Sequence, residues 1–146
     1  MTESRPVCGS VIRYAYLWAD ESARGQDEGK KDRPALVLAV SVKEVDGTTE
    51  VLALAITHRE PADPADAVVF PRDVKRRIGL DDAPAWIVTK EANAFMWPGP
   101  DIRPVPGRTS PTVVYGHVPD RLLKRVARSY LANRDRQRRR LVLRSE

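Results

Sequence analysis

The chain has little of what several common protein classes depend on. Its 146 residues include one cysteine, Cys8, so no intrachain disulfide can form, and we expect a reducing compartment such as the cytoplasm. The two histidines and that cysteine give no recognised metal-ligand spacing, so we expect neither a metal nor a cofactor. No apolar run approaches the length of a membrane span, and the N-terminus lacks the apolar core of a signal peptide, so we expect no membrane association.

The motifs of several enzyme classes are also missing. There is no glycine-rich loop of the kind that holds nucleotide phosphates and no nucleophile elbow. The sequence shows no internal repeat and no low-complexity linker. It predicts one domain over residues 1–133, followed by a basic tail or helix extension over residues 134–146.

The positive charge is concentrated at the C-terminus. The formal net charge is +5, but residues 120–146 contain ten basic and three acidic side chains, against fifteen and seventeen in residues 1–119. The body of the domain therefore has no general attraction for nucleic acid. Six arginines follow Asn133 and could attract RNA or an acidic antitoxin segment; the alternative is a solvated helix end. Because the apolar positions stop at Leu131, we expect a chain ending at Asn133 to fold.

Three strands are predicted in the first part of the chain. Gly9–Trp18 alternates, and one of its faces carries Ile12, Tyr14, Tyr16 and Trp18. A polar loop, Ala19–Lys31, leads to the apolar stretch Arg33–Val42. Asp46-Gly47 is a strong hairpin signal, so we expect Val51–Thr57 to return antiparallel to that stretch.

This hairpin brings the end of its second strand beside the start of its first. We therefore expect Thr57 and His58 to lie near Arg33. Pro34 favours an extended backbone at Arg33, which partly fixes the direction of the side chain. A guanidinium fork at that point suits a phosphate or carboxylate. The alternative is an ordinary surface arginine at a strand end.

The remaining residues predict short elements and a closing helix. Further strands are expected at Ala67–Phe70, Ala85–Lys90, Ala94–Trp97 and Val113–Tyr115. We expect the strand Ala94–Trp97 to pair with Ala85–Lys90. A short helix is expected at Arg72–Ile78. A helix beginning at Pro119 and Asp120 has an apolar stripe of Leu122, Leu123, Val126, Ala127, Tyr130 and Leu131. The fold class is mainly β with a C-terminal helix, as a small barrel or a strongly curved sheet. We expect Trp86 in the core and Trp97 at the surface.

Several of these pieces, in this order, resemble the PemK/MazF family of toxins from toxin–antitoxin systems. They are Gly9-Ser10-Val11-Ile12, a loop carrying Glu28, Lys31-Asp32-Arg33-Pro34-Ala35-Leu36-Val37-Leu38, Leu54-Ala55-Ile56-Thr57, Trp86-Ile87-Val88, and a helix after His117-Val118-Pro119. The resemblance implies an SH3-like small barrel of the PemK/MazF/CcdB-like type, which forms a homodimer and is neutralised by a cognate antitoxin. It also implies a metal-independent endoribonuclease that cuts single-stranded RNA.

The resemblance carries two site residues over to this chain. The arginine of the family's Arg-Pro pair corresponds to Arg33, and the threonine ending its third strand corresponds to Thr57. Other members have an Arg-Thr-Ile-Asp-like segment where this chain reads Asn93-Ala94-Phe95-Met96. The proton-transfer roles of that arginine and aspartate therefore do not carry over. The stretch Trp97–Asp101 looks like a subfamily feature without an assigned mechanism.

Metal-free cleavage uses the 2′-hydroxyl of the RNA to attack the adjacent phosphate, which gives a cyclic phosphate. Arg33 suits neutralisation of the crowded phosphorane, and Thr57 suits donation of one hydrogen bond. His58 is the third catalytic candidate, because an imidazole can carry a proton near neutral pH. The alternatives are a common strand-end threonine and an exposed loop histidine.

The RNA-binding candidates are Glu28, Lys31, Arg59, Glu91 and Asn93. Glu28 and Glu91 could act as bases or bind a nucleobase edge, although Glu91 also fits a solvated strand end. Two other classes of function stay open: a non-enzymatic toxin that binds a protein such as a topoisomerase, and an SH3-like interaction module. Arg33 beside Thr57 in a groove favours the nuclease, whereas a flat apolar surface with Arg33 turned away favours a binder.

Overall fold

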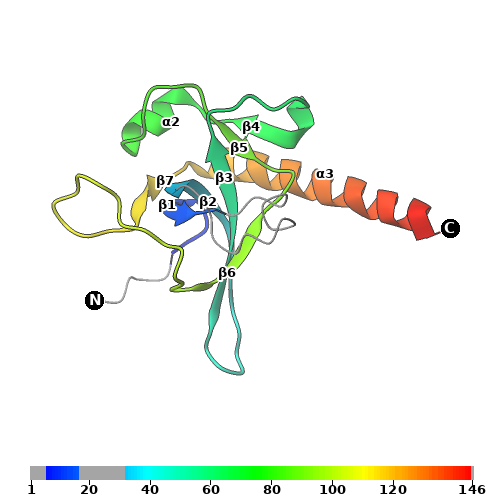
Figure 1. Ribbon diagram of the computed structural model, residues 1–146, viewed down its shortest axis with the longest axis horizontal. Helices are drawn as coiled ribbons and strands as arrows, with labels where there is room; N and C mark the ends of the chain where they lie inside the picture. The colour runs from blue at the N-terminus through cyan, green and yellow to red at the C-terminus, as the bar shows by residue number, and fades with distance from the viewer. Residues whose placement is uncertain (1–5, 17–31, 146) are drawn as a thin grey trace.

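The computed structural model describes residues 6–16 and 32–145, which form a mainly β protein closed by a long helix (Figure 1). The strands are β1 (Ser10–Ala15), β2 (Asp32–Val42), β3 (Thr49–Thr57), β4 (Ala67–Val69), β5 (Trp86–Val88), β6 (Asn93–Trp97) and β7 (Val114–His117). The helices are η1 (Pro64–Asp66), α2 (Arg72–Arg77) and α3 (Asp120–Ser145). The expected fold class, mainly β with a C-terminal helix, is confirmed.

The strands form one open antiparallel sheet. Their order is β4-β5-β3-β2-β1-β7, and β6 also pairs with β3. Within the described chain the two outer strands, β4 and β7, do not pair with each other, so these pairings do not close the sheet into a ring.

The expected pairing of Ala94–Trp97 with the preceding strand is wrong. Strand β6 instead pairs with residues 49–53 of β3, next to the pairing of β5 with Ile56 and Thr57. Both strands run antiparallel to β3 and so lie one after the other along the same edge. Residues 89–92 between them contain no glycine, and the chain does not reverse there.

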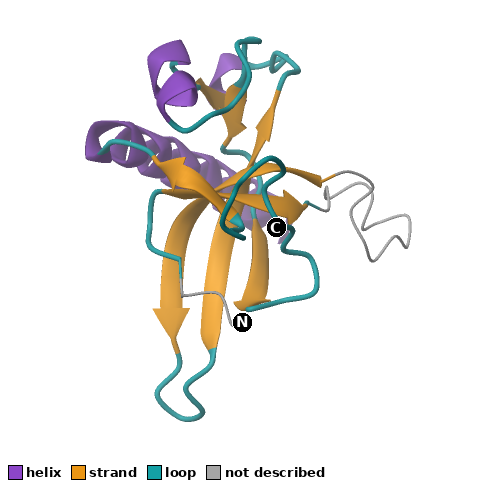
Figure 2. Cartoon of the chain, turned by 90° about the vertical axis from the view of Figure 1, so that its left-hand side faces the viewer, coloured by secondary structure: helices purple, strands orange, loops and turns teal. Residues whose placement is uncertain are grey.

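The β2–β3 hairpin forms as its turn residues predict. The Asp46 carboxylate accepts hydrogen bonds from the Thr48 amide (3.0 Å) and hydroxyl (2.7 Å), and Gly47 has a φ of 71°. A bulge between Val37 and Ala39 shifts the register near the turn, and Ala35 then faces Ala55. Figure 2 shows this hairpin extending away from the end of the molecule that carries the helices.

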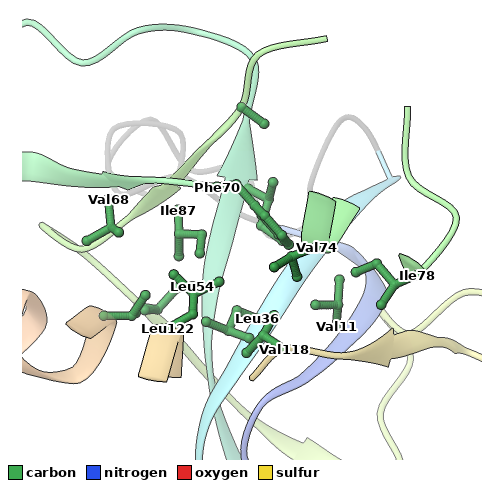
Figure 3. Packing of buried hydrophobic residues seen from close by; sticks show 13 residues of the cluster. Val11, Leu36, Leu54, Val68, Phe70, Val74, Ile78, Ile87, Val118 and Leu122 are labelled. Carbon is green, nitrogen blue, oxygen red and sulfur yellow. The ribbon is translucent and has the colours of Figure 1, made fainter. Parts of the chain in front are cut away.

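The sheet has a separate apolar core on each face. Ile12, Tyr14 and Tyr16 share one core with Ala35 and Trp97, as the alternation of the first strand predicts. The other core lies between the sheet and the helices (Figure 3) and is built from buried residues including Val11, Leu36, Leu54, Phe70, Val74, Ile78, Ile87, Leu122 and Val126. Trp97 is 7% exposed, so its expected surface position is wrong: it packs beside Phe95, with ring centroids 6.2 Å apart.

Helix α3 packs on the body only along its first part. Leu122 and Val126 are buried, but Leu131 is 59% exposed, so the expected stripe is wrong at its last position. The buried residue in this turn is Asn133, which donates from Nδ2 to the carbonyls of Ala65 (3.0 Å) and Thr89 (3.1 Å). Figure 1 shows the helix continuing past this point and projecting beyond the strands. The segment 134–145 is thus a helical extension.

Candidate active-site cleft

A cleft of about 560 Å³ opens where the start of β2 and the end of β3 meet the segment after α2. Arg33, Thr57 and His58 all line it. Its volume lies in the range of about 300–1,000 Å³ that is usual for ligand sites. The cleft therefore collects the three catalytic candidates at one place.

The hairpin register explains why Arg33 and Thr57 meet. The pairing of β2 with β3 ends at Ala35 and Ala55, two residues away from Arg33 and Thr57, so both residues lie just beyond it at the same end of the hairpin. On its other side β2 pairs with β1, where Arg33 faces Tyr14. Facing residues of an antiparallel pair have neighbouring side chains. The bulge between Val37 and Ala39 shifts the register by one residue on the turn side of Ala35, so pairing counted from the turn alone would set Arg33 opposite His58.

Arg33 stands between the cleft and a buried tyrosine. Its Nε atom is buried. Burial raises the pKa of Tyr16, the Glu91 carboxylate raises it further, and the Arg33 charge lowers it. The Tyr16 hydroxyl therefore lies within electrostatic reach of both charges. The sequence placed Tyr16 on a core face but gave no sign that its hydroxyl is close to Arg33.

Thr57 ends β3 in a tight local turn. Its hydroxyl oxygen accepts a hydrogen bond from the Arg59 amide at 3.1 Å. A hydroxyl that accepts one bond keeps its own proton to donate, so Thr57 can still donate to a ligand in the cleft. Arg59 follows His58 in the sequence, and its side chain is exposed.

His58 is held at both ring nitrogens. Its Nδ1 lies 2.9 Å from the Pro84 carbonyl oxygen, and its Nε2 lies 3.0 Å from Oδ2 of Asp81. A carbonyl and a carboxylate both only accept, so the doubly protonated imidazolium alone satisfies both contacts. In this arrangement neither nitrogen can take up a proton. The shuttle role of His58 stays a prediction that requires one of these contacts to open.

The partner of His58 is fixed by a buried lysine. The Lys75 side chain is 3% exposed, and its Nζ lies 3.0 Å from Oδ1 of Asp81. Lys75 also donates to the Ala83 carbonyl. Desolvation alone would raise the pKa of Asp81, but the Lys75 hydrogen bond and the charges of His58 and Lys75 outweigh it and lower that pKa. Asp81 is thus a carboxylate shared between Lys75 and His58.

A second carboxylate of the cleft is also neutralised. Asp32 lies 3.7 Å from an Arg13 nitrogen and 3.5 Å from Nε of Arg103. Arg108 and Tyr115 line the same cleft. The site residues predicted from the sequence do not include Lys75, Asp81, Asp32 and Arg108. Lys75, Asp81 and Arg108 come to the cleft because their segments pack against the start of β2 and the end of β3, whereas Asp32 directly precedes Arg33 in the sequence.

The RNA-binding candidates are distributed differently. Glu28 and Lys31 lie outside the described residues. Glu91 lines a separate cleft of about 380 Å³ beside Asn133 of α3. Asn93 pairs with Ala53 within the sheet. Neither Glu91 nor Asn93 lines the cleft of Arg33, although the Glu91 charge reaches the Tyr16 hydroxyl.

In residues 6–16 and 32–145 no three His, Cys, Asp or Glu side chains gather as metal ligands would. No helix in this part of the chain combines the length and apolarity needed to cross a membrane. No model of a known protein family matches the chain, and no curated protein matches it.

Proposed function

We propose that this chain is an endoribonuclease toxin of the PemK/MazF type, which cleaves single-stranded RNA without a metal or other cofactor. The observation that carries the proposal is the meeting of Arg33 and Thr57 on adjacent antiparallel strands, in the lining of one cleft. A flat apolar surface at this place would favour a protein-binding module, and the cleft supports the nuclease instead.

The proposed reaction proceeds by attack of a 2′-hydroxyl on the neighbouring phosphorus, and the hydroxyl proton passes to water. The bond to the 5′ oxygen of the next nucleotide breaks, and a 2′,3′-cyclic phosphate remains. Arg33 binds the charged non-bridging oxygens through its fork, and Thr57 donates to one of them. His58 could supply the proton to the leaving oxygen once its Nε2 leaves Asp81, since its imidazolium form carries that proton.

The finer features implied by the resemblance belong to the same proposal. They are closure of the curved sheet into an SH3-like small barrel, formation of a homodimer, neutralisation by a cognate antitoxin, and action in the cytoplasm. The neutralised Asp32 and Asp81 are compatible with an RNA ligand, because the cleft then does not repel phosphate.

The test is incubation of the purified protein with mixed-sequence single-stranded RNA in EDTA, followed by analysis of the new ends. We expect cleavage with cyclic phosphate ends. Arg33→Ala, purified in parallel, is the control for contaminating nuclease, and Arg77→Ala controls for loss of an exposed arginine outside the cleft. Activity that EDTA abolishes and magnesium restores would contradict the mechanism. A folded protein that cleaves no RNA would contradict the function.

A further inference from the structure

Arg108 is anchored at the far side of the cleft from β3. Its Nη2 donates to the carbonyls of Ile78 (3.3 Å) and Tyr115 (3.1 Å). Gly79 lies beside this contact and has a φ of 79°, a backbone conformation that favours glycine. Two backbone carbonyls thus fix one end of the guanidinium group. This reduces the entropy cost of binding a ligand through its other N–H groups.

The other end of this guanidinium is available. Within residues 6–16 and 32–145 Arg108 forms no ion pair, and its Nε and Nη1 have no hydrogen-bond partner. Lys75 and His58, by contrast, share Asp81. Arg108 therefore combines a fixed position in the cleft lining with N–H donors that no carboxylate occupies.

Tyr115 supplies a second donor at this place. Burial raises the pKa of its hydroxyl, the Arg13 and Arg108 charges oppose that shift, and Asp32 adds to it. Tyr115 lines the cleft together with Arg108, and its hydroxyl stays protonated at neutral pH, so it can donate.

We propose that Arg108 and Tyr115 form a second phosphate subsite of the cleft, which binds a phosphate flanking the scissile one in single-stranded RNA. This inference rests on the proposed function. The Arg108 N–H groups that the carbonyls leave unused can donate to one phosphate oxygen, and the Tyr115 hydroxyl can donate to another. Because Arg33 lines the same cleft, the subsite fixes the direction in which the strand crosses Thr57.

The experiment measures binding of 2′-O-methyl RNA hexamers, which cannot be cleaved by 2′-hydroxyl attack. One linkage at a time is replaced by an uncharged methylphosphonate, and each oligonucleotide is titrated against wild type, Arg108→Ala, Arg108→Lys and Arg76→Ala. Arg76 is an exposed arginine of α2 that does not line the cleft, so it controls for loss of one charge. Circular dichroism and thermal unfolding establish that each variant folds.

We expect Arg108→Ala to weaken binding of the unmodified hexamer by about tenfold or more, which is typical of a lost hydrogen bond to a charged group. With the methylphosphonate at one particular linkage, Arg108→Ala should weaken binding no further, whereas with the methylphosphonate elsewhere it should still do so. This pattern is expected because a double-mutant cycle isolates the interaction between Arg108 and one phosphate. Arg108→Lys should recover part of the affinity, and Arg76→Ala should show no positional dependence. Equal losses at every position would overturn the subsite, as would unchanged binding.

If Arg108→Ala does not fold, Arg108→Gln keeps an amide donor for the backbone carbonyls and is tested in the same way. These binding measurements do not require cleavage. Positional coupling in a protein that never cleaves RNA would overturn the proposed nuclease activity alone. Cleavage by wild type without positional coupling would overturn the subsite alone.

Discussion

Lys75 is buried in α2, and its ammonium nitrogen lies 3.0 Å from the carboxylate of Asp81, six residues further along the chain. The same carboxylate holds the ring of His58 at the end of β3. One aspartate thus joins α2 to the strand that carries Thr57, so the cleft wall depends on this contact for its shape.

Removal of the Asp81 carboxylate should destabilise the protein. Asp81→Asn leaves the buried Lys75 ammonium facing a neutral amide in place of a carboxylate, and we expect a loss of about 1–3 kcal/mol in the free energy of unfolding. Asp82→Asn removes an exposed pair with Arg76 and should cost less than about 1 kcal/mol. Urea denaturation measures both. Equal small losses would show that Lys75 does not need Asp81.

The Asp81 contribution should also depend on pH in a defined direction. The Lys75 hydrogen bond and the charges of His58 and Lys75 lower the pKa of this carboxyl in the folded state, although desolvation opposes them. A carboxyl with a lowered folded pKa stabilises the protein above its unfolded pKa, and this is lost as pH falls through the folded value. The difference in unfolding free energy between wild type and Asp81→Asn should therefore be constant above about pH 5 and shrink below about pH 4. A difference that grows on acidification would contradict the ion pair.

Arg33→Ala should leave the fold intact and remove most activity. Loss of one preorganised donor to a transition-state oxyanion costs about 2.7–4 kcal/mol, or roughly a hundred- to a thousandfold in rate. Arg33→Lys should also be poor, because a point charge does not reproduce the fork. Thr57→Ala should have a smaller effect. The measurement is kcat/KM on one RNA substrate, with circular dichroism as the control for folding. Wild-type turnover in Arg33→Ala would remove Arg33 from the mechanism.

The helical extension should contribute to RNA binding through charge alone. A truncation that tests this should end at Gln137, because Gln137 donates to the Lys90 carbonyl at 3.1 Å and Arg136 donates to Asn133. A chain ending at Gln137 should fold, bind RNA more weakly at low salt and keep its turnover at saturating RNA. Each lost single-strand phosphate contact should lower the log–log salt slope by about 0.7.

A chain ending at Asn133 is the informative comparison. It loses the Arg136 and Gln137 contacts as well as the arginines beyond them, so we expect it to be less stable than the chain ending at Gln137. The sequence alone predicted that this shorter chain folds. Equal salt slopes for the full chain and the chain ending at Gln137 would show that the extension is only a solvated helix end.

The sequence predicts best those features that are determined by residues close together in the chain. Asp46 and Gly47 specify a turn by their own hydrogen bonds and backbone conformation, and the resulting hairpin brings the end of β3 close to the start of β2. The alternation from Ile12 to Tyr16 likewise follows from the period of a strand. Each inference needs only local geometry and one hairpin.

The sequence predicts less where distant segments compete for one position. Strand β6 pairs with the edge of β3 because the chain does not reverse between β5 and β6. The apolar pattern of Ala94–Trp97 does not reveal this pairing. Asn133 rather than Leu131 faces the body because the Thr89 and Ala65 carbonyls need donors there. The charges around Asp81 and Arg108 are set by similar tertiary contacts, and no spacing in the chain encodes them.

The buried amide of Asn133 has a consequence for how the molecule opens. It binds the Thr89 backbone after β5 and the Ala65 backbone in η1, while the Thr89 amide donates to the Asp66 carbonyl at 2.8 Å. Three segments are therefore held by one small polar cluster on α3. If α3 lifts at this turn, both strands of the β4–β5 ribbon lose their anchor together. Their amide protons should then exchange with solvent as one cooperative unit, distinct from the β1–β2–β3 core.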